Sequence, residues 1–177
     1  MTSKPNTVHP VVIIGSGPAA WTAAIYAARA KLYPLVVVGG TPGGQLMFTT
    51  NVENFPGFEH GILGPTLMET MRKQAEQVGS IVVANDVASV TVEKSNFIIK
   101  NTSNDIIVSR AVIVASGAAA NTLKLPGEDR LMGRGVGTCA VCDAPFYKGK
   151  DTVFVVGGGD SAMEEARALA KFARRVI

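Results

Sequence analysis

The residues with the clearest chemical potential in this sequence are two cysteines followed by an aspartate. Cys139 and Cys142 are the only cysteines among the 177 residues, and Asp143 comes directly after the second of them. Their C-x-x-C spacing suits a structural disulfide, half of a zinc site or a redox-active dithiol. Asp143 could exchange protons with such a dithiol or cap a following turn, and the sequence supports these two roles about equally.

A redox-active dithiol is the interpretation that the rest of the sequence favours. A structural zinc ion needs four ligands, and the other candidates, His9 and His60, are far in sequence from the cysteines and from each other. We therefore expect no metal at the cysteine pair, and we expect both histidines at the surface. Two cysteines cannot form a disulfide scaffold, and a close pair in a chain without an export signal is more often catalytic or metal-binding, so the short spacing favours reversible disulfide closure once zinc is set aside.

Two glycine-rich turns have the pattern G-x-G-x-x-A, at residues 15–20 and 157–162, each after a β-branched run and before a helical stretch. In this pattern the first glycine allows a tight turn, the second lets the backbone approach a pyrophosphate, and the small third residue lets helix and strand pack closely. One match could be a turn without a ligand, whereas two correctly placed matches favour nucleotide binding. Gly39 stands where the first unit would carry an acid for the adenosine ribose, so we expect ribose contacts from the loop 39–45.

The elements around these turns predict an α/β fold. Residues 11–14 and 35–38 read as buried strands that flank a helix at 19–30, so a parallel sheet is expected. Residues 41–64 are too polar and too rich in Gly and Pro for a regular element. A helix is expected at 65–78, with its methionines in the core.

Further along the chain, short strands are expected and the first pattern then starts again. The expected strands are 81–84, 87–92, 97–100, 105–108 and a buried strand at 112–114. A strand at 153–156, a helix at 161–174 and the opening of a strand at 176–177 follow. We place a domain boundary after residue 126, between a Rossmann-like first domain, 1–126, and an incomplete second Rossmann-like domain, 127–177.

Composition and charge narrow the classes of partner. The formal net charge is +3 and the sequence contains no run of Lys and Arg, so nucleic acid is not expected as a partner. Apolar runs are far shorter than the roughly 20 residues that cross a bilayer, so no membrane segment is expected. The opening residues MTSKPNTVHP lack the apolar stretch of a signal peptide, and a cytoplasmic protein is therefore expected.

Five segments occur in the order found in one known family. They are GSGPAAWTAAIYAARA at 15–30, GGQLMFTTNVENFPGF at 43–58, ASGAAANTLKLPGE at 115–128, CAVCD at 139–143 and GGGDSAMEEA at 157–166. Together they resemble the low-molecular-weight thioredoxin reductases. The resemblance implies FAD in the first domain, NADPH in the second, and electron transfer from NADPH through FAD and the cysteine pair to oxidised thioredoxin.

The resemblance also implies roles for individual residues. Cys142 would be the thiol beside the flavin, Cys139 the thiol that attacks thioredoxin, and Asp143 the proton donor or acceptor. Residues implied to bind FAD are Ser16, Gly17, Pro18, Ala19, Gly40, Thr41, Gln45, Asn54 and Val87, and those implied to meet the NADPH phosphates are Gly159, Asp160, Ser161 and Ala162.

Length is the main departure from the family. Relatives continue through the rest of the NADPH domain and return to complete the FAD domain, and the full-length proteins usually form homodimers. We therefore expect an N-terminal fragment that, as it stands, binds FAD poorly. Two alternatives remain: a related flavin reductase that acts on another disulfide, and a non-catalytic fragment that associates with partners through an unfinished sheet edge.

Overall fold

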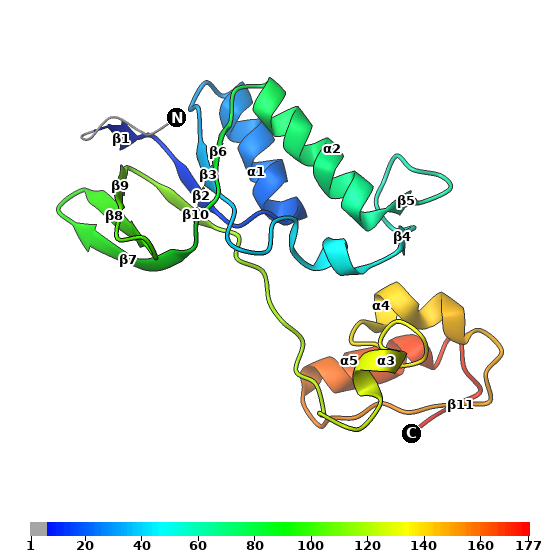
Figure 1. The fold of residues 1–177 in the computed structure, drawn as a ribbon. Coiled ribbons are helices and arrows are strands. Elements are labelled where there is room, and N and C mark those ends of the chain that lie inside the picture. Colours follow the sequence, from blue (N-terminus) through cyan, green and yellow to red (C-terminus); the bar gives the residue numbers. More distant parts are fainter. Residues whose placement is uncertain (1–6) are drawn as a thin grey trace. The chain divides into compact units, whose positions relative to one another are not determined.

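The computed structural model describes residues 7–177, which divide into two compact units (Figure 1). The first unit ends at Ala119 and the second comprises Ala120–Ile177. The expected boundary after residue 126 lies near the start of the second unit. Each unit has its own apolar core, and each is described by itself below.

A parallel sheet forms the centre of the first unit and confirms the α/β fold class. Its strands pair in the order β10-β2-β3-β6, and Ile13 of β2 lies between Val36 and Ile113 in register. The strands are β2 (Val12–Ile14), β3 (Leu35–Val37), β6 (Ile81–Val83) and β10 (Val112–Val114). A helix, α1 (Pro18–Arg29), connects β2 to β3, which pair in parallel, so the strand-helix-strand prediction for the opening segment is confirmed.

Two helices pack together and share a core with one face of this sheet (Figure 1). These are α1 (Pro18–Arg29) and α2 (Gly64–Gln77), both with a proline in the first turn, where the missing N–H would have no partner in the helix. Trp21 of α1 and Leu67 of α2 are almost fully buried in this core. Met68 and Met71 are also buried, which confirms the prediction that these methionines belong to the core.

A second sheet shares a core with the other face of the parallel sheet. Alternate residues of a strand point to opposite faces, so Val12 and Val37 meet Ile99 on the side away from the helices. The strand order is β1-β9-β8-β7, and only the β1–β9 pair is parallel. The strands are β1 (Val8–His9), β7 (Val87–Glu93), β8 (Asn96–Asn101) and β9 (Ile106–Ser109).

His9 corrects one expectation, because it is buried rather than at the surface. It pairs with Ser109 in β9, and the Ser109 hydroxyl donates to the His9 carbonyl oxygen at 3.1 Å. Desolvation lowers the pKa of the imidazole. His60, in contrast, is exposed as expected.

Two other expectations for the first unit were wrong. Residues 41–64 contain a 3-10 helix, η1 (Gly44–Phe48), and a short antiparallel pair, β4 (Asn51–Val52) and β5 (Ile62–Leu63). The hydrogen bonds between β4 and β5 are made across the loop, and local composition does not reveal them. The expected buried strand β10 lies at the edge of its sheet, and 70% of Val114 is exposed.

The second unit is built from short elements around a small core. They are α3 (Glu128–Leu131), α4 (Ala140–Asp143), η2 (Ala144–Tyr147), β11 (Thr152–Val153), α5 (Asp160–Leu169) and β12 (Arg175–Val176). The expected final strand is confirmed, because β12 pairs in parallel with β11. The expected helix to residue 174 was too long: α5 ends at Leu169, and the chain turns so that Ala173 enters the core and β12 reaches β11.

Candidate active site

The first glycine turn lies between β2 and α1 and is held tightly on one side. Gly15 has φ +126°, and a Cβ on it would collide with the carbonyl of Ala115, so the turn needs glycine there. Gly17 is the N-cap of α1, and no atom of the described residues beyond its chain neighbours lies within 4 Å of the place where its Cβ would stand. The first helical residues, Pro18 and Ala19, carry no charge. The first turn of α1 has no acidic residue, so its free amides are available to an anion.

A second glycine pair, Gly43 and Gly44, packs against this turn. The Ser16 side chain is buried, and its Oγ accepts a hydrogen bond from the Gly43 N–H at 2.9 Å. A Cβ on Gly44 would stand 3.4 Å from the Gly17 Cα, so the two backbones approach closely. The structure thus brings together two of the segments that the family resemblance had assigned to one cofactor.

Gln45 and Thr41 lie in the segment that carries this glycine pair. The Gln45 Nε2 donates to the carbonyl oxygen of Ala118 at 3.2 Å, across 73 residues of sequence. The Thr41 carbonyl oxygen accepts a long hydrogen bond, 3.5 Å, from the Gly44 N–H. Both side chains are exposed and therefore accessible to a ligand.

Asp86 is a residue that the sequence interpretation missed. Its Oδ1 accepts a hydrogen bond from the Gly40 N–H at 2.8 Å, and it would lie 2.9 Å from a Cβ on Gly39. This exposed carboxylate comes from the segment after β6. It lies beside Gly39, the position after β3 where the sequence has glycine instead of an acid. Val87, a predicted FAD-binding residue, follows it directly at the start of β7.

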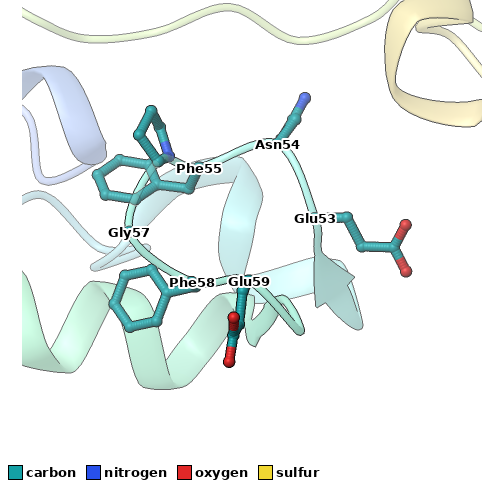
Figure 2. Close-up of a pocket in the computed structure, with 7 residues that line it drawn as sticks. Glu53, Asn54, Phe55, Gly57, Phe58 and Glu59 are labelled. Atoms are coloured by element: carbon teal, nitrogen blue, oxygen red, sulfur yellow. The ribbon is translucent and has the colours of Figure 1, made fainter.

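Asn54 lies in a different part of the first unit, the loop between β4 and β5 (Figure 2). Residues 53–59 of this loop line a hollow of about 590 Å³, which includes no other predicted site residue. The rings of Phe55 and Phe58 lie on one side with centroids 6.1 Å apart, and the Asn54 and Glu53 side chains point away from them. This hollow is therefore formed by the loop itself, and no residue of the glycine turn lines it.

The second glycine turn follows β11 and leads into α5. Gly157 has φ +150°, and a Cβ on it would stand 2.9 Å from the Cβ of Ala162, which shows why the third residue of the pattern is small. Gly159 is the N-cap of α5, Asp160 lies in its first turn, and Ser161 follows. The turn is exposed, so its amides are accessible to a phosphate group.

The two cysteines form a disulfide at the start of α4. Their Cα atoms are 5.3 Å apart, within the usual range for a disulfide, and Cys139 is the N-cap of the helix. The Cys139 sulfur accepts a hydrogen bond from the Cys142 N–H at 3.2 Å. Cys142 is exposed and Cys139 is half-buried.

The Asp143 carboxyl is enclosed beside this disulfide. It is half-buried, and its Oδ2 occupies the place where a Cβ on Gly137 would stand. Desolvation raises the pKa of the carboxyl, and the negative charge of Glu165 raises it further. Desolvation and the Asp143 charge likewise raise the pKa of Tyr147.

The alternative role for Asp143, capping a turn, is only partly realised. Asp143 is the N-cap residue of η2, but within the described residues its carboxyl makes no capping hydrogen bond. A half-buried carboxyl with a raised pKa, adjacent in sequence to a disulfide cysteine, is a candidate for proton exchange with the cysteine pair.

Glu165 is a second residue that the sequence interpretation missed. It lies on α5, and its Oε2 accepts a hydrogen bond from the Ala140 N–H, between the two cysteines, at 2.7 Å. Ala140 and Glu165 are 25 residues apart. Because only tertiary packing brings α4 and α5 together, no local pattern could have signalled this contact.

Residues 7–177 contain no group of three or more His, Cys, Asp or Glu side chains arranged to hold a metal ion. In the same residues, no helix combines the length and apolar character needed to cross a membrane.

Comparison with known proteins identifies the family. The chain is 53% identical to a thioredoxin reductase of Mycolicibacterium smegmatis, covering 98% of this chain and 55% of that protein. It is 53% identical to NADPH-dependent thioredoxin reductase 3 of Arabidopsis thaliana, covering 99% of this chain and 34% of that protein. The solved structure of thioredoxin reductase from Giardia duodenalis superposes with a TM-score of 0.87 at 44% identity, covering 94% of this chain and 54% of that one.

These relatives confirm the resemblance to thioredoxin reductases, and the chain spans between a third and about half of their lengths. Residues 9–177 match the family described as pyridine nucleotide-disulphide oxidoreductase. The chain therefore belongs to the pyridine nucleotide-disulphide oxidoreductase family.

Proposed function

We propose that this chain contributes the FAD-binding turn, the NADPH-binding turn and the redox dithiol of a thioredoxin-disulfide reductase. The observation that carries the proposal is the Cys139–Cys142 disulfide beside the enclosed Asp143 carboxyl. Two nucleotide-type glycine turns accompany it, and the relatives named thioredoxin reductase support the substrate class. The proposed domain assignment is FAD in residues 1–126 and NADPH in residues 127–177.

For FAD, the proposed cradle is the first glycine turn and the segments that close on it. Ser16, Gly17 and Ala19 offer the pyrophosphate backbone amides at a helix N-terminus whose first turn has no acid, and Pro18, which has no N–H, lies between them. Gly40, Thr41 and Gln45 lie on the adjoining segment, and Val87 lies beside Asp86, which binds Gly40. Asn54 is proposed as a further contact from its exposed loop.

For NADPH, the proposed contacts come from the turn before α5. Gly159, Ser161 and Ala162 present backbone amides close to the helix N-terminus. A carboxylate repels a phosphate, so Asp160 takes part through its N–H rather than its side chain. When bound, NADPH supplies two electrons and FAD passes them on to the disulfide.

The dithiol then reduces thioredoxin by two exchange steps. The Cys139 thiolate attacks one sulfur of the thioredoxin disulfide, so a mixed disulfide forms while the other thioredoxin sulfur leaves as a thiolate. The Cys142 thiolate next attacks the Cys139 sulfur, which restores the Cys139–Cys142 disulfide and releases the second thioredoxin thiolate. Two electrons pass from the dithiol to thioredoxin, and two protons complete the thioredoxin thiols.

Two features of the structure support this division of roles. The Cys142 N–H already donates to the Cys139 sulfur, and the same donor would stabilise a Cys139 thiolate. The raised pKa of Asp143 means that its carboxyl holds a proton more readily than an ordinary aspartate, as suits a group that delivers a proton to a departing thiolate.

The proposed setting is a reducing compartment, the cytoplasm, where a dithiol of this kind is kept in turnover by NADPH. Thioredoxin is the proposed protein substrate, and a homodimer is the proposed assembly of the full-length reductase. Nucleic acid and membrane are not among the proposed partners.

The test is a visible absorption spectrum of the purified chain after incubation with FAD and gel filtration, followed by NADPH and then oxidised thioredoxin. Retained flavin that NADPH bleaches and thioredoxin reoxidises supports the proposal. In a Cys142→Ser variant, NADPH should still bleach the flavin, and thioredoxin should no longer restore its colour.

Other outcomes separate the alternatives. Reoxidation by a different disulfide, with thioredoxin inert, indicates a related flavin reductase. A colourless protein would mean that these segments do not hold FAD without the rest of the reductase, and it leaves a non-catalytic role for this chain by itself.

A further inference from the structure

We infer that Glu165 is a positioning residue for the dithiol: its carboxylate holds the Ala140 amide between the two cysteines and places a negative charge beside Asp143. The inference rests on the proposed function, because it concerns the proton donor proposed for the dithiol. It adds a residue from α5, the helix that follows the nucleotide turn, to the chemistry of the cysteine pair.

The hydrogen bond fixes the start of α4. Ala140 is the first helical residue after the Cys139 N-cap, so its N–H has no partner within the helix. It is 4% exposed, and the Glu165 Oε2 accepts from it at 2.7 Å, the length of a charge-assisted bond. Without Glu165, a buried donor directly between the cysteines would be left unsatisfied.

The same carboxylate acts on Asp143 through its charge. The titratable groups that face Asp143 are Glu165 from α5 and Tyr147 from η2, and these elements pack against α4. Desolvation is the larger cause of the raised Asp143 pKa, and repulsion by Glu165 adds to it in the same direction. A protonated Asp143 is the form that can give a proton to a thiolate, so Glu165 favours the donor form.

Glu165 therefore has two separable effects, and two substitutions divide them. Glu165→Gln keeps an oxygen that can accept from the Ala140 N–H but removes the charge. Glu165→Ala removes both. Glu164→Gln is the matched control, because Glu164 is the neighbouring residue on the same helix and is exposed, whereas Glu165 is half-buried.

The experiment measures the oxidised 177-residue chain without any nucleotide or thioredoxin. Carbon-13 NMR follows the Asp143 carboxyl through a pH titration, and hydrogen exchange follows the Ala140 amide. Glu165→Gln should lower the Asp143 pKa and leave the Ala140 amide protected. Glu165→Ala should lower the pKa and also speed Ala140 exchange, and Glu164→Gln should change neither by as much.

An Asp143 pKa that is the same in wild type and folded Glu165→Gln would overturn the charge effect. Unchanged Ala140 exchange in folded Glu165→Ala would overturn the positioning effect, and circular dichroism establishes that each variant is folded. If Glu165→Ala does not fold, Glu165→Gln still decides the charge effect. Since neither readout needs turnover, a failure here is distinct from a failure to reduce thioredoxin.

Discussion

The first glycine turn, Gly15–Gly17, is held on one side by segments from elsewhere in its unit, whereas the second, Gly157–Gly159, is exposed and contacts its own helix. Gly15 lies under the Ala115 carbonyl, 100 residues away, and Ser16 is tied to Gly43. The closest atom to a Cβ on Gly157 belongs to Ala162, five residues on. One sequence pattern is thus positioned by tertiary contacts in one unit and by local packing in the other.

This difference separates two requirements that the pattern combines. The first glycine of each turn is needed for the backbone conformation, because both Gly15 and Gly157 have positive φ. Only Gly15 also faces a backbone carbonyl, which cannot rotate away as a side chain can. The consequences of the same substitution should therefore differ between the two turns.

The largest effect is expected from Gly15→Ala. It combines an unfavourable φ with a collision against the Ala115 carbonyl, and it should lower the free energy of unfolding by about 3 kcal/mol or more. Trp21 is the only tryptophan of the chain and is buried in the first unit, so its fluorescence during urea unfolding measures this loss.

Gly17→Ala is the matched control for that measurement. Gly17 has φ −77°, and its Cβ would enter open space, so the free energy of unfolding should change by only about 0.5 kcal/mol. FAD binding by the same variant should weaken, because the added methyl group occupies the space proposed for the pyrophosphate. Equal stability losses at the two positions would mean that the first turn is not held by Ala115.

A smaller effect is expected from Gly157→Ala. The strained φ remains, but the added Cβ meets only the methyl group of Ala162, which can shift with the start of α5. The loss of stability should be about 1–2 kcal/mol and confined to the second unit. Hydrogen exchange of the α5 amides should speed up while Trp21 fluorescence unfolding is unchanged; a loss as large as that of Gly15→Ala would contradict the comparison.

Many of the helices, strands and turns were predictable because local sequence patterns determine them. The four strands of the parallel sheet, the strands β7, β8 and β9, the helix α1 and both glycine turns follow from β-branched runs, an alanine-rich stretch and glycine spacing, which require no knowledge of distant residues. The Cys139–Cys142 pair was equally clear, because its members are three residues apart. Burial of β10 was predicted wrongly, because the order of strands within a sheet is not a local property.

The polar contacts of the sites were not predictable for the same physical reason. Asp86 and Gly40 are 46 residues apart, and Glu165 and Ala140 are 25 apart. An exposed aspartate after a strand or a glutamate on a helix is indistinguishable in sequence from an ordinary solvated residue. Only the pairing of β3 with β6 and the packing of α4 on α5 give these carboxylates their partners.

Asp86→Ala tests whether the hydrogen bond from Gly40 to Asp86 also holds the loop beside the first glycine turn. The Gly40 N–H loses its acceptor, so the free energy of unfolding should fall by about 1 kcal/mol and FAD affinity should fall with it. Asp86→Asn keeps an acceptor oxygen and should lose less stability. FAD titrations monitored by flavin fluorescence, together with Trp21 unfolding curves, measure both effects. A variant as stable as wild type would show that the Asp86 contact does not hold this loop.

The smallest effects are expected from pH, and they should have opposite signs in the two units. Burial lowers the pKa of His9 from its ordinary value of 6.5, so the unfolded chain binds the proton more readily than the first unit does. This unit should therefore lose stability as the pH falls below about 6.5. The pKa of Asp143 is raised above its ordinary 3.8, so the folded second unit holds the proton more readily. Its stability should decline as the pH rises from 3.8 through the raised pKa.

Substitutions isolate these two contributions from those of the other titratable groups. His9→Gln should remove part of the loss of Trp21-monitored stability between pH 7 and pH 5, because a glutamine cannot take up the proton that favours the unfolded chain. Asp143→Asn should remove part of the decline in α5 amide protection as the pH rises from 4. The structure indicates that His9 and Asp143 contribute to stability with opposite pH dependence. The same sign for both contributions would contradict it. Opposite signs would show that protonation of His9 destabilises the first unit, whereas protonation of Asp143 stabilises the second unit, which carries the dithiol.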